Sequence, residues 1–201
     1  MAALEAFLEV VKIVLIVLGS AVGVLLLVAL FGCFLPRSHV AARTLRSKKT
    51  PEDVWNVLCD YASVPTWHPE VKKVERQPDK NGHDVWRETD KRGYAVQLET
   101  IEAAAPRRLV RAIADESGPF TGQWEFDIAP ADEGSRVTLT ERGQIANPFF
   151  RVMFRAFMTP SFYLELYLKA LAAKLGDEPV LEELTTETQR HREDKNRGDK
   201  Q

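Results

Sequence analysis

Residues 13–35 contain no charged side chain, and this run constrains the fold of the chain more than any other feature. Sixteen of its 23 residues are Leu, Ile, Val or Phe, so a helix built from them is apolar on every face. At a rise of about 1.5 Å per residue the run is about 35 Å long, slightly more than the roughly 30 Å hydrocarbon core of a bilayer. We therefore predict one transmembrane helix within an N-terminal segment of residues 1–36.

The alternative to a permanent anchor is a cleaved signal peptide. Such a peptide needs a basic N-terminal region and a shorter apolar stretch. Here Glu5 and Glu9 outweigh Lys12 ahead of the run, and the run itself is too long. We expect a single-pass membrane protein, and its first partner is the lipid bilayer.

Basic side chains follow the run with no acidic residue among them: Arg37, Arg43, Arg46, Lys48 and Lys49. Because Lys and Arg are enriched on the cytoplasmic side of membrane helices, they favour a cytoplasmic soluble domain. Several of them also fall in the first expected strand, which leaves the opposite orientation open.

Gly19 and Gly23 are four residues apart within the run. This spacing lets two membrane helices pack closely, although it also occurs often by chance. A homodimer through these glycines is therefore one expectation, and an unpaired helix is the other.

The first elements of the soluble part have clear signals. Thr50-Pro51-Glu52-Asp53 is typical of a helix start, with Thr as the N-cap, Pro in the first turn and acidic residues near the N-terminus. From residue 71 onward, apolar side chains tend to recur at every second position, most regularly over residues 124–128. These patterns predict a strand, short helices and then a long meander of antiparallel strands.

The end of the chain changes character. Apolar side chains follow helical spacing over residues 150–175, where Pro160 is expected to kink or split the helix. The segment 177–201 is dense in charge, and we predict that it is disordered. We therefore assign residues 37–176 to one ligand-binding domain.

This order of elements predicts an α+β helix-grip fold, in which a curved antiparallel sheet of six to seven strands surrounds a long C-terminal helix. Such an arrangement is expected to leave a cavity between sheet and helix that suits an apolar ligand. The residues expected to bind it are Trp67, Trp86, Val96, Leu98, Trp124, Phe126, Val137, Leu139, Glu141, Phe150, Phe154 and Phe157.

The stretch Thr50-Pro51-Glu52-Asp53-Val54-Trp55, followed by Asp60-Tyr61 and then by Trp67-His68-Pro69-Glu70-Val71, resembles the opening of the START/polyketide cyclase (SRPBCC) superfamily. The resemblance extends over about residues 38–175 and implies the helix-grip fold. The family includes lipid-transfer domains, ubiquinone-binding proteins, aromatic polyketide cyclases, plant hormone receptors and co-chaperones. Fold alone therefore does not choose a function, and the site must.

Two residues are candidates for a general base, although neither is a confident catalytic assignment. If Val137 and Leu139 face inward, the period of two also places Glu141 inward. A buried Glu141 paired with an Arg could hold the polar head of a ligand or act as an acid–base group. Alternatively, Glu141 lies beyond the buried part of the sheet. His68 borders the expected cavity mouth or is an exposed loop residue.

The sequence gives no reason to expect a cofactor, a metal or nucleic acid. The four histidines have no second ligand at metal spacing, and the net charge is −2. An aromatic cluster near residue 150 is either core and cavity wall, or a gate in which Phe149, Arg151 and Arg155 meet the bilayer surface.

We expect a membrane-anchored, non-enzymatic protein that binds or transfers a hydrophobic small molecule, such as a lipid, a quinone or a polyketide-like compound. One alternative is a protein-interaction module without a ligand. The other is an enzyme similar to the polyketide cyclases and dehydratases, with Glu141 or His68 as the base.

Overall fold

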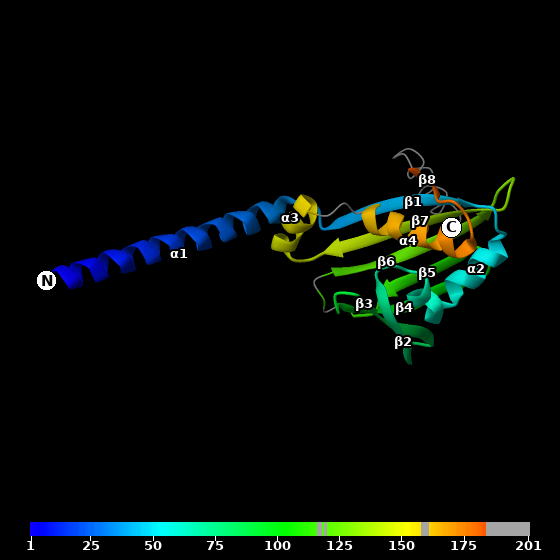
Figure 1. Ribbon diagram of the computed structural model, residues 1–201, viewed down its shortest axis with the longest axis horizontal. Coiled ribbons are helices and arrows are strands. Elements are labelled where there is room, and N and C mark those ends of the chain that lie inside the picture. The colour runs from blue at the N-terminus through cyan, green and yellow to red at the C-terminus, as the bar shows by residue number, and fades with distance from the viewer. Residues whose placement is uncertain (116–117, 119, 158–160, 184–201) are drawn as a thin grey trace. The chain divides into compact units, whose positions relative to one another are not determined.

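The computed structural model describes residues 1–115, 118, 120–157 and 161–183 of the 201-residue chain (Figure 1). It divides into two compact units. The anchor unit comprises Met1–Arg37 and Ile145–Met158, and the sheet unit comprises Ser38–Gln144 and Thr159–Gln201.

The anchor unit contains two helices. Helix α1 (Ala2–Phe34) includes most of the predicted apolar run and begins earlier in the chain. Its part from Phe7 to Phe34 is long and apolar enough to cross a membrane, and almost all of its side chains are exposed. The short helix α3 (Pro148–Phe157) is the second element of this unit.

The sheet unit is built on one open antiparallel sheet of eight strands in the order β2-β3-β4-β5-β6-β7-β1-β8 (Figure 1). The alternating segments of the sequence supply seven of them. The strands are β1 (Ser38–Ser47), β2 (Val71–Lys80), β3 (His83–Asp90), β4 (Ala95–Ala104), β5 (Arg108–Ile113), β6 (Phe120–Pro130), β7 (Ser135–Ile145) and β8 (Val180–Glu183).

The strand count corrects the prediction of six to seven strands. The additional strand β8 comes from the charged segment that we expected to be disordered, and it pairs with β1. In this pairing Arg46 donates from Nε to Glu182 Oε1 over 2.6 Å, so charged side chains help to hold an edge strand. Residues 184–201 of the tail lie outside the described residues.

The predicted helix start at Thr50 is confirmed. Helix α2 (Pro51–Cys59) begins with a capping box, in which the Thr50 side chain accepts from Asp53 N and the Asp53 carboxylate accepts from Thr50 N, both over 3.2 Å. The 3₁₀ helix η1 (Tyr61–Thr66) follows directly and leads into β2.

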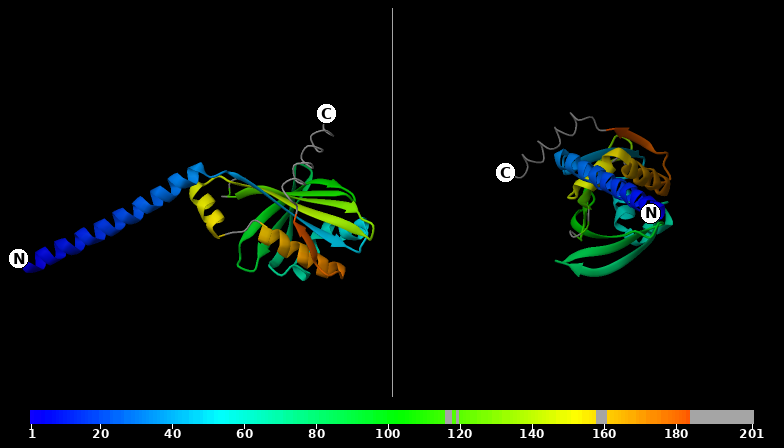
Figure 2. Two further views of the ribbon diagram at one scale, coloured as in Figure 1. Left: turned by 90° about the horizontal axis from the view of Figure 1, so that it is seen from above. Right: turned by 90° about the vertical axis from the view of Figure 1, so that its left-hand side faces the viewer.

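The long C-terminal helix of the predicted fold is two separate helices. Helix α3 ends at Phe157 and helix α4 (Ser161–Leu175) begins on the far side of Pro160. Pro160 itself lies outside the described residues. Only α4 belongs to the sheet unit, and it lies against one face of the sheet (Figure 2).

The core of the sheet unit lies between that face and the helices α2 and α4. Its fully buried side chains come from every layer: Leu45, Val54, Leu58, Leu109, Phe126, Val137, Leu139, Leu164, Leu168 and Leu171. A second, smaller cluster joins Tyr61, Val64 and Val71, and Trp67 packs against both clusters. Burial of these side chains is the main force that holds α4 on the sheet.

Replacement of a core phenylalanine tests this assignment. We expect Phe126→Ala to lower the free energy of unfolding by about 3–5 kcal/mol, because the side chain is 1% exposed and leaves a cavity. Phe162→Ala on α4 is the matched control, since that ring is 59% exposed, and it should cost less than about 1 kcal/mol. Chemical unfolding of the full chain in detergent measures both, and equal losses would contradict the assigned core.

Candidate functional site

Tyr167 of α4 lies at the centre of the layer between α4 and the sheet. Its ring contacts four other rings at centroid distances of 5.4–5.8 Å: Trp67, His68, Trp124 and Phe126. Trp67 and His68 follow η1, and Trp124 and Phe126 lie on β6. Sheet, helix and connecting loop thus meet in one aromatic cluster.

The Tyr167 hydroxyl and Arg111 Nε, both in this interior, have no hydrogen-bond partner among the described residues, and a third such atom is the Ser135 hydroxyl at the start of β7. Tyr167 is 3% exposed and Arg111 is 4% exposed. Buried polar atoms in proteins nearly always have a partner, because leaving one unpaired costs about 1–3 kcal/mol. The described residues therefore leave the hydrogen-bonding capacity of both atoms unmet.

Arg111 belongs to a buried polar group with Tyr61 and Glu88. The Tyr61 hydroxyl donates to Glu88 Oε2 over 2.5 Å. The Arg111 guanidinium lies 4.1 Å from the centre of the Tyr61 ring, and its Nη2 donates to the Leu58 carbonyl over 2.9 Å. One carboxylate, one phenol and one guanidinium are thus held together next to the aromatic cluster.

Burial shapes the protonation of these groups. It raises the pKa of the Glu88 carboxyl, which the hydrogen bond from Tyr61 and the charge of Arg111 oppose. It also raises the pKa values of the Tyr61 and Tyr167 phenols, so both stay neutral at physiological pH. Burial lowers the pKa of His68, against the opposing effect of Glu70. Near neutral pH, His68 is therefore an uncharged imidazole.

Glu141 lies on β7 and is half-buried, with its side chain 21% exposed. Its Oε1 is 3.2 Å from His39 Nε2. Burial raises its pKa, and hydrogen bonds from His39 and Trp124 oppose the rise. Glu141 thus shares a hydrogen bond with one aromatic residue of the central cluster, and its other side-chain partner is a histidine of β1.

The expected ligand-binding residues of the strands lie on two sides of the Tyr167 cluster. Val137 and Leu139 are fully buried in the main core. Trp86 and Leu98 pair across β3 and β4 and pack on the smaller cluster. Val96 lies opposite Glu88 in the same pair of strands. The structure therefore brings the strand residues of the predicted lining together along one face.

The three expected lining residues Phe150, Phe154 and Phe157 are not part of this cluster. They lie on α3, which belongs to the anchor unit, because the predicted long helix is divided.

Sequence reasoning missed Arg111 and Tyr167. Arg111 is two residues after the buried Leu109 on β5, so both side chains point to the same face of the sheet. Tyr167 is three residues after the buried Leu164 on α4, so both lie on the same side of that helix. Periodicity could therefore have placed both inside. It could not have shown that the charge of Arg111 acts on the pKa of Tyr167, because the two residues lie far apart in the sequence.

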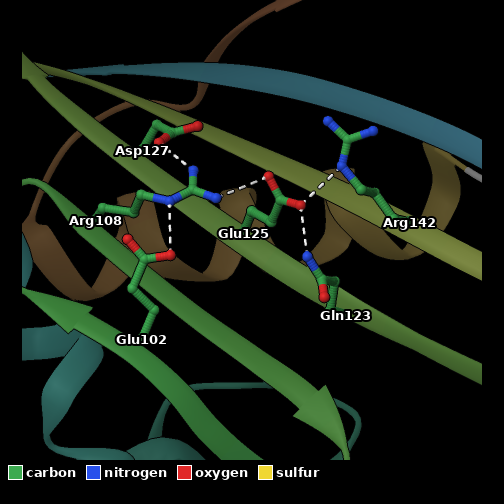
Figure 3. A network of polar contacts seen from close by, with 6 residues as sticks. All are labelled: Glu102, Arg108, Gln123, Glu125, Asp127 and Arg142. Atoms are coloured by element: carbon green, nitrogen blue, oxygen red, sulfur yellow. Dashed lines mark hydrogen bonds and ion pairs between the residues drawn. The ribbon is translucent and has the colours of Figure 1, made fainter. Parts of the chain in front are cut away.

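A second polar network covers the opposite face of the sheet (Figure 3). Arg108 binds Glu102, Glu125 and Asp127 at 3.1, 3.2 and 2.7 Å, and Arg142 binds Glu125 at 2.7 Å. Burial raises the pKa of Glu125, but Gln123, Arg142 and Arg108 outweigh it and lower the pKa overall. These carboxylates are already paired with cations, so we assign the network a structural role.

The comparisons with known proteins agree with this geometry. Residues 39–176 match the family described as "Polyketide cyclase / dehydrase and lipid transport". The chain therefore belongs to this family. A search of curated proteins gave no match.

Solved structures share the fold at low sequence identity. A START superfamily protein from Mycobacterium smegmatis is 16% identical with a TM-score of 0.51, and the match covers 69% of this chain and 97% of that one. Norcoclaurine synthase from Thalictrum flavum is 13% identical with a TM-score of 0.55, and the match covers 69% of this chain and 93% of the synthase. An aromatase/cyclase from a Streptomyces species is 15% identical with a TM-score of 0.52, and the match covers 70% of this chain and 93% of the aromatase/cyclase.

Two tyrosine-to-phenylalanine replacements separate the paired hydroxyl from the unpaired one. Tyr61→Phe removes the donor to a buried carboxylate and should lower the free energy of unfolding by about 1.5–3 kcal/mol. Tyr167→Phe removes a hydroxyl without a partner and should leave that free energy unchanged or raise it. Parallel unfolding curves of the two variants, prepared free of small molecules, provide the measurement. A larger loss from Tyr167→Phe would contradict the geometry.

The pKa of His68 is expected to lie below its ordinary value of 6.5. The folded state then binds fewer protons than the unfolded state between the two pKa values. The contribution of His68 to stability is therefore complete above about pH 6.5 and falls as the pH decreases. Titration of the histidine ring protons by NMR checks this, with His68→Gln assigning the signal. A midpoint at or above 6.5 would show that the ring is not desolvated.

Proposed function

We propose that the chain is a membrane-tethered binding protein that holds a hydrophobic small molecule between α4 and the sheet. The single observation that carries this proposal is the unpaired Tyr167 hydroxyl and Arg111 Nε beside the aromatic cluster and the apolar core. Membership of a polyketide cyclase and lipid-transport family supports it.

The chemistry of the two unpaired atoms limits the ligand class. Arg111 Nε is a hydrogen-bond donor, and the neutral phenol of Tyr167 can also donate. A ligand with an apolar body and an oxygen acceptor at one end satisfies both requirements. A quinone carbonyl, a polyketide carbonyl and the ester or carboxylate of a lipid share this acceptor chemistry. Its apolar part would gain about 0.8 kcal/mol per buried CH₂.

We further propose that α1 crosses the bilayer as a single-pass anchor. Its exposed apolar surface from Phe7 to Phe34 supports this, because such a surface is unfavourable in water. The basic residues that follow α1 favour a cytoplasmic sheet unit. A β-carbon at Gly19 or Gly23 would meet no other atom within 4 Å, so both positions are open to a second α1 in a homodimer.

The anchor and the site serve the same function in this proposal. Apolar ligands of this class dissolve in the bilayer, and a tether raises the effective concentration of the site at that surface. The protein would therefore take its ligand from the membrane or deliver it there.

Co-purification tests the proposal directly. The full chain is extracted from membranes into lipid nanodiscs, released and analysed by native mass spectrometry. We expect one apolar compound to remain bound to each chain after the loosely attached lipids are removed. If the chain carries no bound compound, side chains alone fill the interior. That result would favour the protein-interaction module instead.

The Tyr167 hydroxyl is expected to contribute to affinity rather than to folding. Loss of one hydrogen bond of about 1 kcal/mol should weaken binding of a fluorescent polyene fatty acid about fivefold in Tyr167→Phe. Tyr163→Phe is the matched control, because Tyr163 lies on the same helix and is 42% exposed. Equal affinities for the two variants would place the ligand elsewhere.

A further inference from the structure

Helix α3 has a sharply divided surface. Asn147 caps its N-terminus, with Oδ1 accepting from Phe149 N over 2.9 Å and from Phe150 N over 3.4 Å. Helical spacing then gathers all of its large apolar residues except Val152 on one side, and Arg151 and Arg155 on the other. The apolar side consists of Phe149, Phe150, Met153, Phe154 and Phe157.

Arg151 ties this helix to the end of α1. It is only 4% exposed, and its guanidinium donates to carbonyl oxygens of both segments of the anchor unit. Nη1 reaches Gly32 O at 3.0 Å and Leu35 O at 3.4 Å, and Nε and Nη2 reach Ile145 O at 2.9 Å and Ala146 O at 2.6 Å.

This contact satisfies a need of α1 that its own sequence does not meet. The last carbonyls of a helix lack partners within the helix and carry a partial negative charge. The last turn of α1 contains no basic residue. Gly32 O also accepts from Leu35 N over 3.3 Å. Arg151 therefore adds further hydrogen bonds at this end of α1 and supplies the positive charge from another part of the chain.

The backbones of the two helices also meet closely. Gly32 is buried in the last turn of α1, and a β-carbon there would collide with the carbonyl group of Pro148, the first residue of α3. Figure 2 shows α3 running across the axis of α1 at its C-terminal end. Any bilayer that α1 crosses must therefore have its surface at the level of α3.

Three side chains of the apolar side of α3 are exposed. Phe157 is 77% exposed, Met153 is 40% exposed and Phe150 is 39% exposed. By helical spacing Arg155 lies on the opposite side of α3, where anionic head groups would lie if the apolar side faces the bilayer. A helix of this kind that runs across a membrane anchor has the properties of an interfacial helix.

We propose that α3 is an in-plane helix that inserts its Phe150–Met153–Phe157 side into the head-group boundary of the bilayer, with Arg151 fixing it to α1. The partner of this surface is the lipid bilayer itself. The proposal rests on the proposed membrane anchor and adds a second point of contact, which fixes how the anchor unit is held at the membrane surface.

Spin labels at single cysteines of the full chain test the proposal in phosphatidylcholine–phosphatidylglycerol nanodiscs, in a background of Cys33→Ser and Cys59→Ser. The labelled variants are Phe157→Cys, Arg155→Cys and Leu25→Cys. We expect the label at position 157 to collide preferentially with oxygen, which dissolves in the bilayer. The label at position 155 should collide preferentially with a water-soluble nickel chelate.

The label at position 25, in the middle of α1, separates the two proposals. If it lies in the hydrocarbon while the label at position 157 is in water, the interfacial helix is wrong and the anchor stands. If the label at position 25 is itself in water, the anchor is wrong. A label at position 157 that neither reagent reaches would show a protein surface covering α3, and would also overturn the proposal.

The role of Arg151 needs its own variant. Arg151→Met keeps a long side chain but removes all of its donors, so α3 should detach from α1. We expect the label at position 157 to become severalfold more mobile, while the label at position 25 keeps its depth. Unchanged mobility at position 157 would show that Arg151 does not hold α3.

Discussion

The contact between α4 and the sheet organises everything else in the sheet unit. Leu164, Leu168 and Leu171 are fully buried against strand residues such as Leu139 and Phe126, and no other helix crosses the middle of this face among the described residues. Because burial of apolar area is the dominant stabilising force, α4 must stay on the sheet. The same contact carries Tyr167 into the interior, where its hydroxyl has no hydrogen-bond partner among the described residues.

The two units solve the same physical problem in opposite ways. Arg151 in the anchor unit satisfies its guanidinium with four carbonyl oxygens and thereby holds α3 to α1. Arg111 in the sheet unit is equally buried but leaves Nε without a partner. A partner on every guanidinium nitrogen is typical of a structural cation, whereas the unpaired Nε of Arg111 beside Glu88 and Tyr61 is what the proposed ligand would satisfy.

Local signals in the sequence predicted much of this fold. The Thr50 cap and the alternation of the strands depend on neighbouring residues, and both appear in the structure. Strand β8 was missed because it depends on pairing with β1 rather than on its own four residues. Glu141 was one candidate for a buried acid near an arginine. In the structure Glu88 lies near an arginine, because tertiary pairing of β3, η1 and β5 brings Tyr61 and Arg111 to it.

The central claim is that a small molecule completes the interior beside Tyr167. A crystal structure of the full chain, purified together with the compounds it retains from membranes, tests this most directly. We expect density for an elongated apolar molecule between α4 and the sheet, with an oxygen within about 3.2 Å of the Tyr167 hydroxyl and of Arg111 Nε. An interior filled by protein side chains, with both atoms paired to protein groups, would contradict the account.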